Sequence, residues 1–100
     1  MSNRIRINPA AWTDATAYDQ GTRGVVEPRV WELRTGPVRL IVHRLHGYDG
    51  WIWFGSCPEL KIDRTSLAAT SATEAQSELM TLALEKARGY VQALELAGAQ

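Results

Sequence analysis

The side chains best suited to chemistry near neutral pH are those of His43, His46 and Cys57. Histidine titrates near neutrality, and a cysteine becomes a nucleophile when its thiol loses a proton. A zinc site usually needs four ligands at suitable spacing, and the sequence does not supply two more. Cys57 stands before Pro58, at the end of a predicted strand, where no helix N-terminus would lower its pKa. We therefore predict neither a metal site nor thiol catalysis.

Three acidic residues, Asp49, Glu59 and Asp63, are close to one another only along the chain. They fall in predicted turns and loops, where aspartate and glutamate are common for conformational reasons. Paired carboxylates that act as acid and base also need a cleft to hold a substrate. No glycine-rich phosphate-binding motif is present in the sequence. We therefore expect a protein that is not an enzyme and that holds no cofactor.

The composition describes a small folded chain with no strong electrostatic field. Its 100 residues are enough for one modest core, and 45% of them are hydrophobic, four being tryptophan. This content is too apolar for a disordered chain. Eleven basic and eleven acidic residues give a formal net charge of zero. Strong attraction to nucleic acid or to an anionic membrane is therefore not expected.

The single cysteine and the excess of arginine over lysine indicate the cellular compartment and the kind of genome from which the chain comes. One cysteine cannot form an internal disulfide and fits a reducing compartment. The N-terminal segment also lacks the apolar region of a secretory signal, so we expect a cytoplasmic location. Arginine far outnumbers lysine, as in many proteins from GC-rich bacterial or phage genomes.

The chain divides into an irregular N-terminal arm, residues 1–24, and one sheet-plus-helix domain, residues 25–100. Two hairpins are expected in the domain. A turn at Thr35-Gly36 would place Leu33 opposite Val38, Trp31 opposite Leu40, and Glu32 opposite Arg39. This register puts apolar pairs on one face of the sheet and an opposite-charge pair on the other.

The second hairpin is expected to turn through a five-residue loop, residues 46–50, which holds an Asp-Gly pair. Leu45 then lies opposite Trp51, His43 opposite Trp53, and Val42 opposite Phe54. The two hairpins agree on one core face, although a slip of one residue would exchange the faces. The predicted core face comprises Trp31, Leu33, Val38, Leu40, Val42, Ile52 and Phe54.

A short fourth strand is expected at residues 65–69, in preference to residues 60–62. Ser71 and Glu74 form a capping box that starts a helix, which should run to about Ala97 and stop at Gly98. Its apolar arc is wide enough to cover a sheet. The predicted fold is α+β, with an antiparallel three- or four-stranded β-meander packed against one long C-terminal α-helix.

Two short segments stand at the ends of predicted elements: Ser56-Cys57-Pro58-Glu59-Leu60 at the end of a strand, and Thr73-Glu74-Ala75 at the start of the helix. With these segments the chain resembles the sheet-and-helix domain of HicB-type antitoxins. The resemblance covers residues 38–94 and implies the same architecture. The additional DNA-binding segment that such antitoxins usually carry has no counterpart here, so we draw no function from it.

The face of the sheet turned away from the helix is expected to be amphipathic and aromatic. Tryptophan and arginine are enriched at interface hot spots, which favours a protein-interaction module. A protein partner or a homodimer would bind there, and the protein could serve as a phage or mobile-element accessory. The alternatives are nucleic-acid binding by the same face and a face covered by the arm through Ile5, Ile7, Trp12 or Tyr18. The expected partner-binding residues are Trp51, Trp53, His43, Arg39, Leu45 and Arg34.

Overall fold

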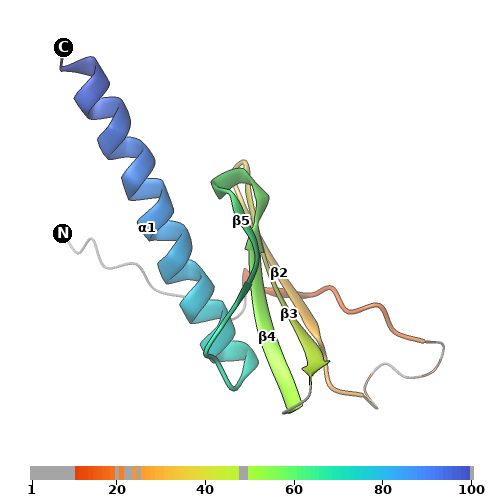
Figure 1. Cartoon of the computed structure of the whole chain (residues 1–100). Helices are drawn as coiled ribbons and strands as arrows, with labels where there is room; N and C mark the ends of the chain where they lie inside the picture. The colour runs from red at the N-terminus through yellow and green to blue at the C-terminus, as the bar shows by residue number, and fades with distance from the viewer. Residues whose placement is uncertain (1–10, 20, 22–23, 25, 48–49, 100) are drawn as a thin grey trace, which may run out of the picture.

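A computed structural model shows a five-stranded antiparallel sheet with one long helix against one of its faces (Figure 1). The structure describes residues 11–19, 21, 24, 26–47 and 50–99. The strands follow one another in space in chain order, as in a meander. They are β1 (Thr13–Asp14), β2 (Val30–Thr35), β3 (Val38–Gly47), β4 (Gly50–Cys57) and β5 (Ile62–Ser66).

The remaining elements are a 3-10 turn, η2 (Pro58–Leu60), and the helix α1 (Ala72–Gly98). The predicted α+β fold is therefore confirmed, with five strands where three or four were expected. The additional strand is β1, which comes from the predicted N-terminal arm and pairs with β2 through Thr13 and Asp14. Trp12 next to it joins the buried core, so part of the arm packs onto the sheet. Ile5 and Ile7 lie outside the described residues.

The first hairpin turns at Gly36-Pro37, one residue later than predicted. Gly36 adopts a positive φ of 56°, a conformation that favours glycine. Leu33 therefore pairs with Leu40, not Val38, and Arg39 pairs with Arg34, not Glu32. The predicted pairs were wrong by two residues. Because side chains alternate with a period of two, the faces of both strands are nevertheless as predicted.

The second hairpin differs by one residue, and this error exchanges the faces of β4. Gly47 pairs with Gly50, so strand pairing continues further toward the turn than the predicted five-residue loop would allow. Leu45 pairs with Ile52, where Trp51 was expected, and Arg44 pairs with Trp53. The tryptophans of β4 therefore share the side of Leu40 and Val42, which the helix covers. Ile52 and Phe54, predicted to lie in the core, point to the other face.

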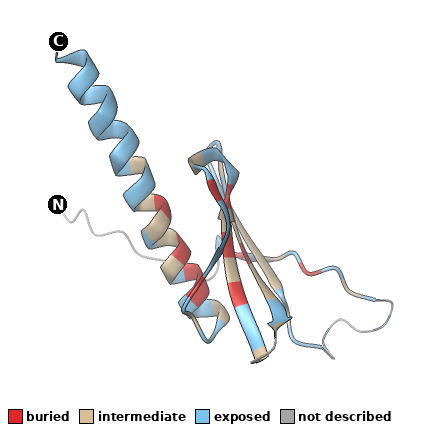
Figure 2. Ribbon diagram, in the orientation of Figure 1, coloured by how far each residue is buried: buried red, intermediate tan, exposed pale blue. Residues whose placement is uncertain are grey.

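The core lies between the sheet and the first half of α1 (Figure 2). Gly55 of β4 lets the helix come close, since a Cβ atom there would lie 2.9 Å from Leu79 Cδ1. We call this side of the sheet the inner face. The buried apolar residues are Trp12, Leu40, Val42, Trp53, Cys57, Ile62, Leu67, Ala75, Leu79 and Ala83.

The start of α1 follows the predicted capping box in part. Ser71 Oγ accepts a hydrogen bond from the Glu74 amide at 3.2 Å, as expected of an N-cap. The Glu74 carboxylate does not reach the cap amide and instead accepts from the Thr70 amide at 2.8 Å. The helix ends at Gly98, one residue beyond the expected end.

The last strand, β5, starts earlier than predicted. It pairs Ile62 with Cys57 and Thr65 with Gly55, with an irregularity between the two pairs. Arg64 lies in this irregularity with a positive φ of 44°. The strand ends at Ser66, and residues 67–69, which were expected to belong to it, lie outside it.

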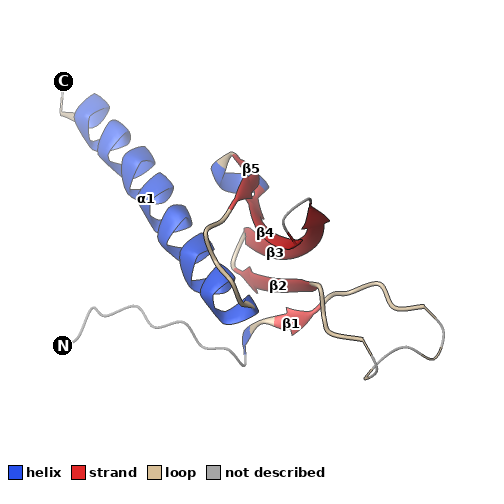
Figure 3. Cartoon of the chain, turned by 60° about the horizontal axis from the view of Figure 1, so that its bottom comes forward, coloured by secondary structure: helices blue, strands red, loops and turns tan. Residues whose placement is uncertain are grey.

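The helix runs obliquely to the sheet, and its second half extends past the sheet edge (Figures 1 and 3). Among the described residues, no helix has the length and apolar character that crossing a membrane requires.

Candidate functional site

The structure separates the six predicted partner-binding residues between the two faces of the sheet. Trp53 lies on the inner face and is only 4% exposed, as part of the core. Trp51 lies on the same side, near the end of the hairpin, and is 51% exposed. Their predicted place beside Leu45 and His43 on the outer face was wrong, because the β3–β4 register differs by one residue. His43, Leu45, Arg39 and Arg34 lie on the outer face by strand alternation.

Trp51 is engaged by neighbouring side chains on its own side of the sheet. The Arg44 guanidinium carbon lies 4.2 Å from the centroid of the Trp51 ring. Arg44 also forms an ion pair with Glu27 at 3.0 Å, and His46 contacts Trp51 edge-on at 5.1 Å between ring centroids. A cation over an aromatic ring contributes about 0.5–2 kcal/mol, depending on how far it is desolvated. Trp51 is thus held by side chains of its own hairpin, and these contacts explain its position without a binding partner.

The outer face carries an apolar row across the three central strands, and we call this set the outer apolar row. Its centre consists of two cross-strand pairs, Leu45 with Ile52 and His43 with Phe54. The His43 and Phe54 rings stack with centroids 5.4 Å apart. Leu45 and Ile52 are exposed. The row comprises Val30, Ile41, His43, Leu45, Ile52 and Phe54.

Two members of this row, Ile52 and Phe54, were assigned to the core by the predicted register. One signal in the sequence could have placed them correctly. Gly55 follows Phe54, and a residue without a side chain suits the face on which a helix packs closely. Placing Gly55 on the inner face puts its neighbour Phe54 on the outer face.

A shallow groove follows the edge of this surface where the chain before β2 approaches. Its volume is about 320 Å³, and the outer-row residues Val30, Ile41, His43 and Leu45 contribute to its lining. Thr16, whose hydroxyl accepts hydrogen bonds from the Arg29 and Val30 amides at 2.8 and 3.0 Å, bounds the groove. One wall of the groove is thus held in place by hydrogen bonds from the backbone of residues 29 and 30 to the Thr16 side chain.

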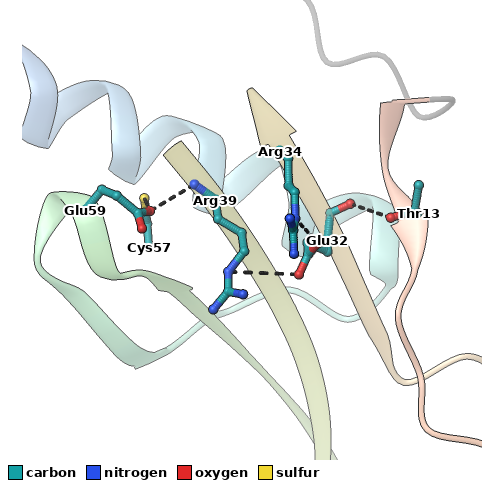
Figure 4. Close-up of polar contacts among 6 residues, drawn as sticks. All are labelled: Thr13, Glu32, Arg34, Arg39, Cys57 and Glu59. Atoms are coloured by element: carbon teal, nitrogen blue, oxygen red, sulfur yellow. Dashed lines mark hydrogen bonds and ion pairs between the residues drawn. The ribbon is translucent and has the colours of Figure 1, made fainter. Parts of the chain in front are cut away.

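Charged residues border the apolar row at the end of the first hairpin (Figure 4). Glu32 forms an ion pair with Arg34 at 2.7 Å and approaches Arg39 Nε at 4.0 Å. The predicted Glu32–Arg39 attraction therefore exists diagonally across the strands. Arg39 and Arg34 are exposed. Glu32 lies between the two guanidinium groups, and the Glu59 carboxylate accepts from the Arg39 amide at 2.9 Å, so this border carries both signs of charge.

His43 lies within the row as a neutral side chain. Its burial lowers its pKa below the ordinary value, and the positive charge of Arg64 lowers it further. Its Nε2 atom is buried and has no hydrogen-bond partner among the described residues. A neutral imidazole stacked on Phe54 behaves as an aromatic member of the row at neutral pH.

Cys57 has the environment of a structural thiol. It is fully buried, and burial raises the pKa of its thiol, with a further upward effect from the Glu59 carboxylate. Its Sγ atom lies 4.0 Å from Glu59 Oε1 (Figure 4). The Arg39 amide donates to the same oxygen at 2.9 Å and holds the pKa of Glu59 below its usual range. A protonated thiol beside a carboxylate is a poor nucleophile.

A second groove, of about 570 Å³, lies between β5 and the middle of α1. Lys61, Lys86 and Glu85 contribute charged groups to it, and Leu82 and Tyr90 contribute apolar surface. No three histidine, cysteine, aspartate or glutamate side chains gather to hold a metal ion in the described part of the chain. The groove contains no arrangement of nucleophile and base that would define a reaction.

Comparisons with protein-family models, with curated proteins and with solved structures find no match to this chain. The function is therefore argued from the surfaces of the molecule.

Proposed function

We propose that this protein is a non-catalytic interaction module that binds a protein partner through the outer apolar row. The observation that carries the proposal is the pairing of exposed Leu45 and Ile52 beside the His43–Phe54 stack, on a face that α1 does not cover. Contiguous apolar surface that remains exposed is typical of interaction sites. The proposed role is that of an accessory protein of a phage or mobile element.

The chemistry of the surface indicates the kind of partner. The centre is apolar and aromatic, and the groove beside it combines aliphatic side chains with two arginines, Arg29 and Arg44. Arg34 and Arg39 form the border at one end. A partner should therefore present apolar side chains to the row and polar or charged groups to this rim of arginines and Glu32, which is the usual division between the core and the rim of an interface.

The register argues against the nucleic-acid alternative. That alternative depended on Trp51 and Trp53 as stacking platforms on the arginine-bearing face, and both residues lie on the other side of the sheet. Phe54, part of the His43 stack, remains there. The net charge of zero provides little of the phosphate attraction that dominates nucleic-acid affinity.

The test is a capture experiment from nuclease-treated bacterial lysate with the full chain, comparing wild type with the double variant Leu45→Thr, Ile52→Thr. Threonine favours strands, so the sheet should persist, as circular dichroism melting would verify. The control is Leu96→Thr, which removes a leucine that is more exposed than Leu45 or Ile52 and lies at the far end of α1. We expect a partner that wild type and control retain and that the double variant loses.

Mapping the bound partner onto the methyl groups of Ile41, Leu45 and Ile52 by NMR would complete the support. Ligands that disappear on nuclease treatment, with affinity that falls steeply with salt, would instead support nucleic acid. A partner that both variants bind equally would contradict the outer row as the binding surface.

A further inference from the structure

The helix α1 carries two apolar stripes; the first faces the sheet, and the second packs against the core at its first member, Met80. The sheet-facing stripe includes Ala75, Leu79 and Ala83, all buried. The second is centred about 100° further round the helix than these three residues, for an ordinary turn of about 100° per residue. Its spacing alternates between four and three residues, which is the a/d repeat of a coiled coil. We call it the seam, and its members are Met80, Leu84, Ala87, Val91, Leu94 and Gly98.

The seam is open where the helix leaves the sheet. Val91 is 52% exposed and Leu94 is 73% exposed. The second half of α1 is almost entirely exposed in Figure 2. A hydrogen bond from the Tyr90 hydroxyl to the Leu60 carbonyl joins it to η2. From Ala87 to Gly98 the seam spans about 17 Å at 1.5 Å per residue. This length suffices for several layers of side chains from a second helix.

We propose that the seam binds the seam of a second copy of this chain, with the two helices antiparallel. A two-fold arrangement brings each residue against the same partner twice, once from each copy. With Val91 opposite Leu94 of the other copy, Ala87 lies opposite Gly98. The two small residues at the outer layers permit close approach of the helices there.

The charges beside the seam determine the direction and the register. Arg88 and Glu95 both occupy the e position, and neither has an ion-pair partner among the described residues. In an antiparallel pair the e positions of the two helices face each other, so Arg88 meets Glu95 of the other copy twice. In a parallel pair, e faces g, and these residues would meet Ala83 and Tyr90.

Moving the antiparallel helices by one heptad keeps apolar layers but places Arg88 opposite Arg88 of the other copy. This arrangement sets like charges against each other. The proposed register is thus the one in which seam packing and charge pairing agree. It also leaves the outer apolar row free, because the row lies on the opposite face of the sheet from α1.

The first test is sedimentation equilibrium of the full chain at low salt over a range of concentrations. Wild type should show a monomer–dimer equilibrium. Leu94→Glu places two unpaired carboxylates in the seam and should weaken dimerisation by about 100-fold or more. The matched control, Leu96→Glu, lies on the other side of the helix at 65% exposure and should change the dissociation constant little. A wild type that remains monomeric, or equal effects of the two variants, would overturn the proposal.

The second test separates antiparallel from parallel pairing. Arg88→Glu and Glu95→Arg should each weaken the dimer by about 5-fold at low salt, since two attractions become repulsions. The double variant, R88E with E95R, should restore the wild-type dissociation constant. Both positions are exposed, so circular dichroism should show the same fold in all variants. Failure of the double variant to recover would exclude the antiparallel register.

Discussion

The two halves of α1 are alike in leucine and alanine content but differ in their surroundings. Leu79 in the first half is 0% exposed and lies against Gly55 of the sheet, whereas Leu94 in the second half is 73% exposed. Both halves are rich in leucine and alanine and both are helical. Helix propensity and apolar content are therefore not what separates them.

The difference arises from the lengths of the packed elements. The helix has 27 residues and spans about 40 Å, whereas β3 and β4 have ten and eight residues and span about 26–33 Å. The helix also crosses the sheet obliquely, so it leaves the sheet before its own end (Figure 3). The first half is stabilised by burial within the chain, and the second half retains apolar surface for an external contact.

The largest expected difference is between two leucine truncations. Leu79→Ala should lower the free energy of unfolding by about 2–5 kcal/mol, because it removes a fully buried side chain and leaves a cavity. Leu94→Ala should lower the stability of the monomer by less than about 0.5 kcal/mol. Urea unfolding at a concentration where the protein is monomeric measures both. Equal losses would show that the second half is also packed within the chain.

A smaller effect is expected when the close approach of the first half is disturbed from the sheet side. In Gly55→Ala the new Cβ would lie 2.9 Å from Leu79 Cδ1 and 3.4 Å from Leu67 Cδ1. Overpacking of this kind costs about 1–3 kcal/mol. The matched control is Gly89→Ala in the second half, where no atom lies within 4 Å and alanine favours the helix.

Thermal unfolding of the two glycine variants should therefore move in opposite directions, with Gly55→Ala lower and Gly89→Ala unchanged or slightly higher. If Gly55→Ala were as stable as wild type, Leu79 would be able to change rotamer without a loss of stability. The contact between the helix and β4 would then be less tight than the structure shows.

The sequence predicted those features that depend on residues close together in the chain. The capping serine and the apolar period gave the helix and its approximate ends, and alternation gave the faces of β2 and β3. The face of β4 could not be decided by alternation, because Trp51 and Trp53 on one side and Ile52 and Phe54 on the other are equally apolar. The close contact between Gly55 and Leu79 of the helix decides which of these two faces is buried. That contact joins residues far apart in the chain, so alternation along β4 does not reveal it.

The pH dependence of the free energy of unfolding should reveal the contribution of the Glu74 carboxylate at the start of α1. Hydrogen bonds from the Thr70 amide and hydroxyl hold the pKa of Glu74 below its ordinary value of 4.5. The folded state thus prefers the charged form, so this stabilisation is present above about pH 4.5 and is lost as the pH falls through the lower folded pKa. The stability difference between wild type and Glu74→Gln should shrink between pH 6 and pH 3.

Glu85→Gln, which removes a carboxylate from the exposed side of the same helix, is the matched control for that series. Amide exchange at residues 72–75 reports the helix start directly. A stability difference that stays constant with pH would show that the Thr70 contacts do not favour the charged form.

The smallest effect is expected at the one hydrogen bond by which the second half contacts the rest of the described chain. The Tyr90 hydroxyl donates to the Leu60 carbonyl at 3.3 Å, in an exposed position. Exposed hydrogen bonds exchange readily with water, so Tyr90→Phe should change the free energy of unfolding by less than about 0.5 kcal/mol. Amide exchange of residues 88–98 should be fast in both proteins when they are monomeric. A loss above about 1 kcal/mol, or slow exchange in the wild-type monomer, would mean that the second half is docked on η2, and the contrast between the halves would then disappear.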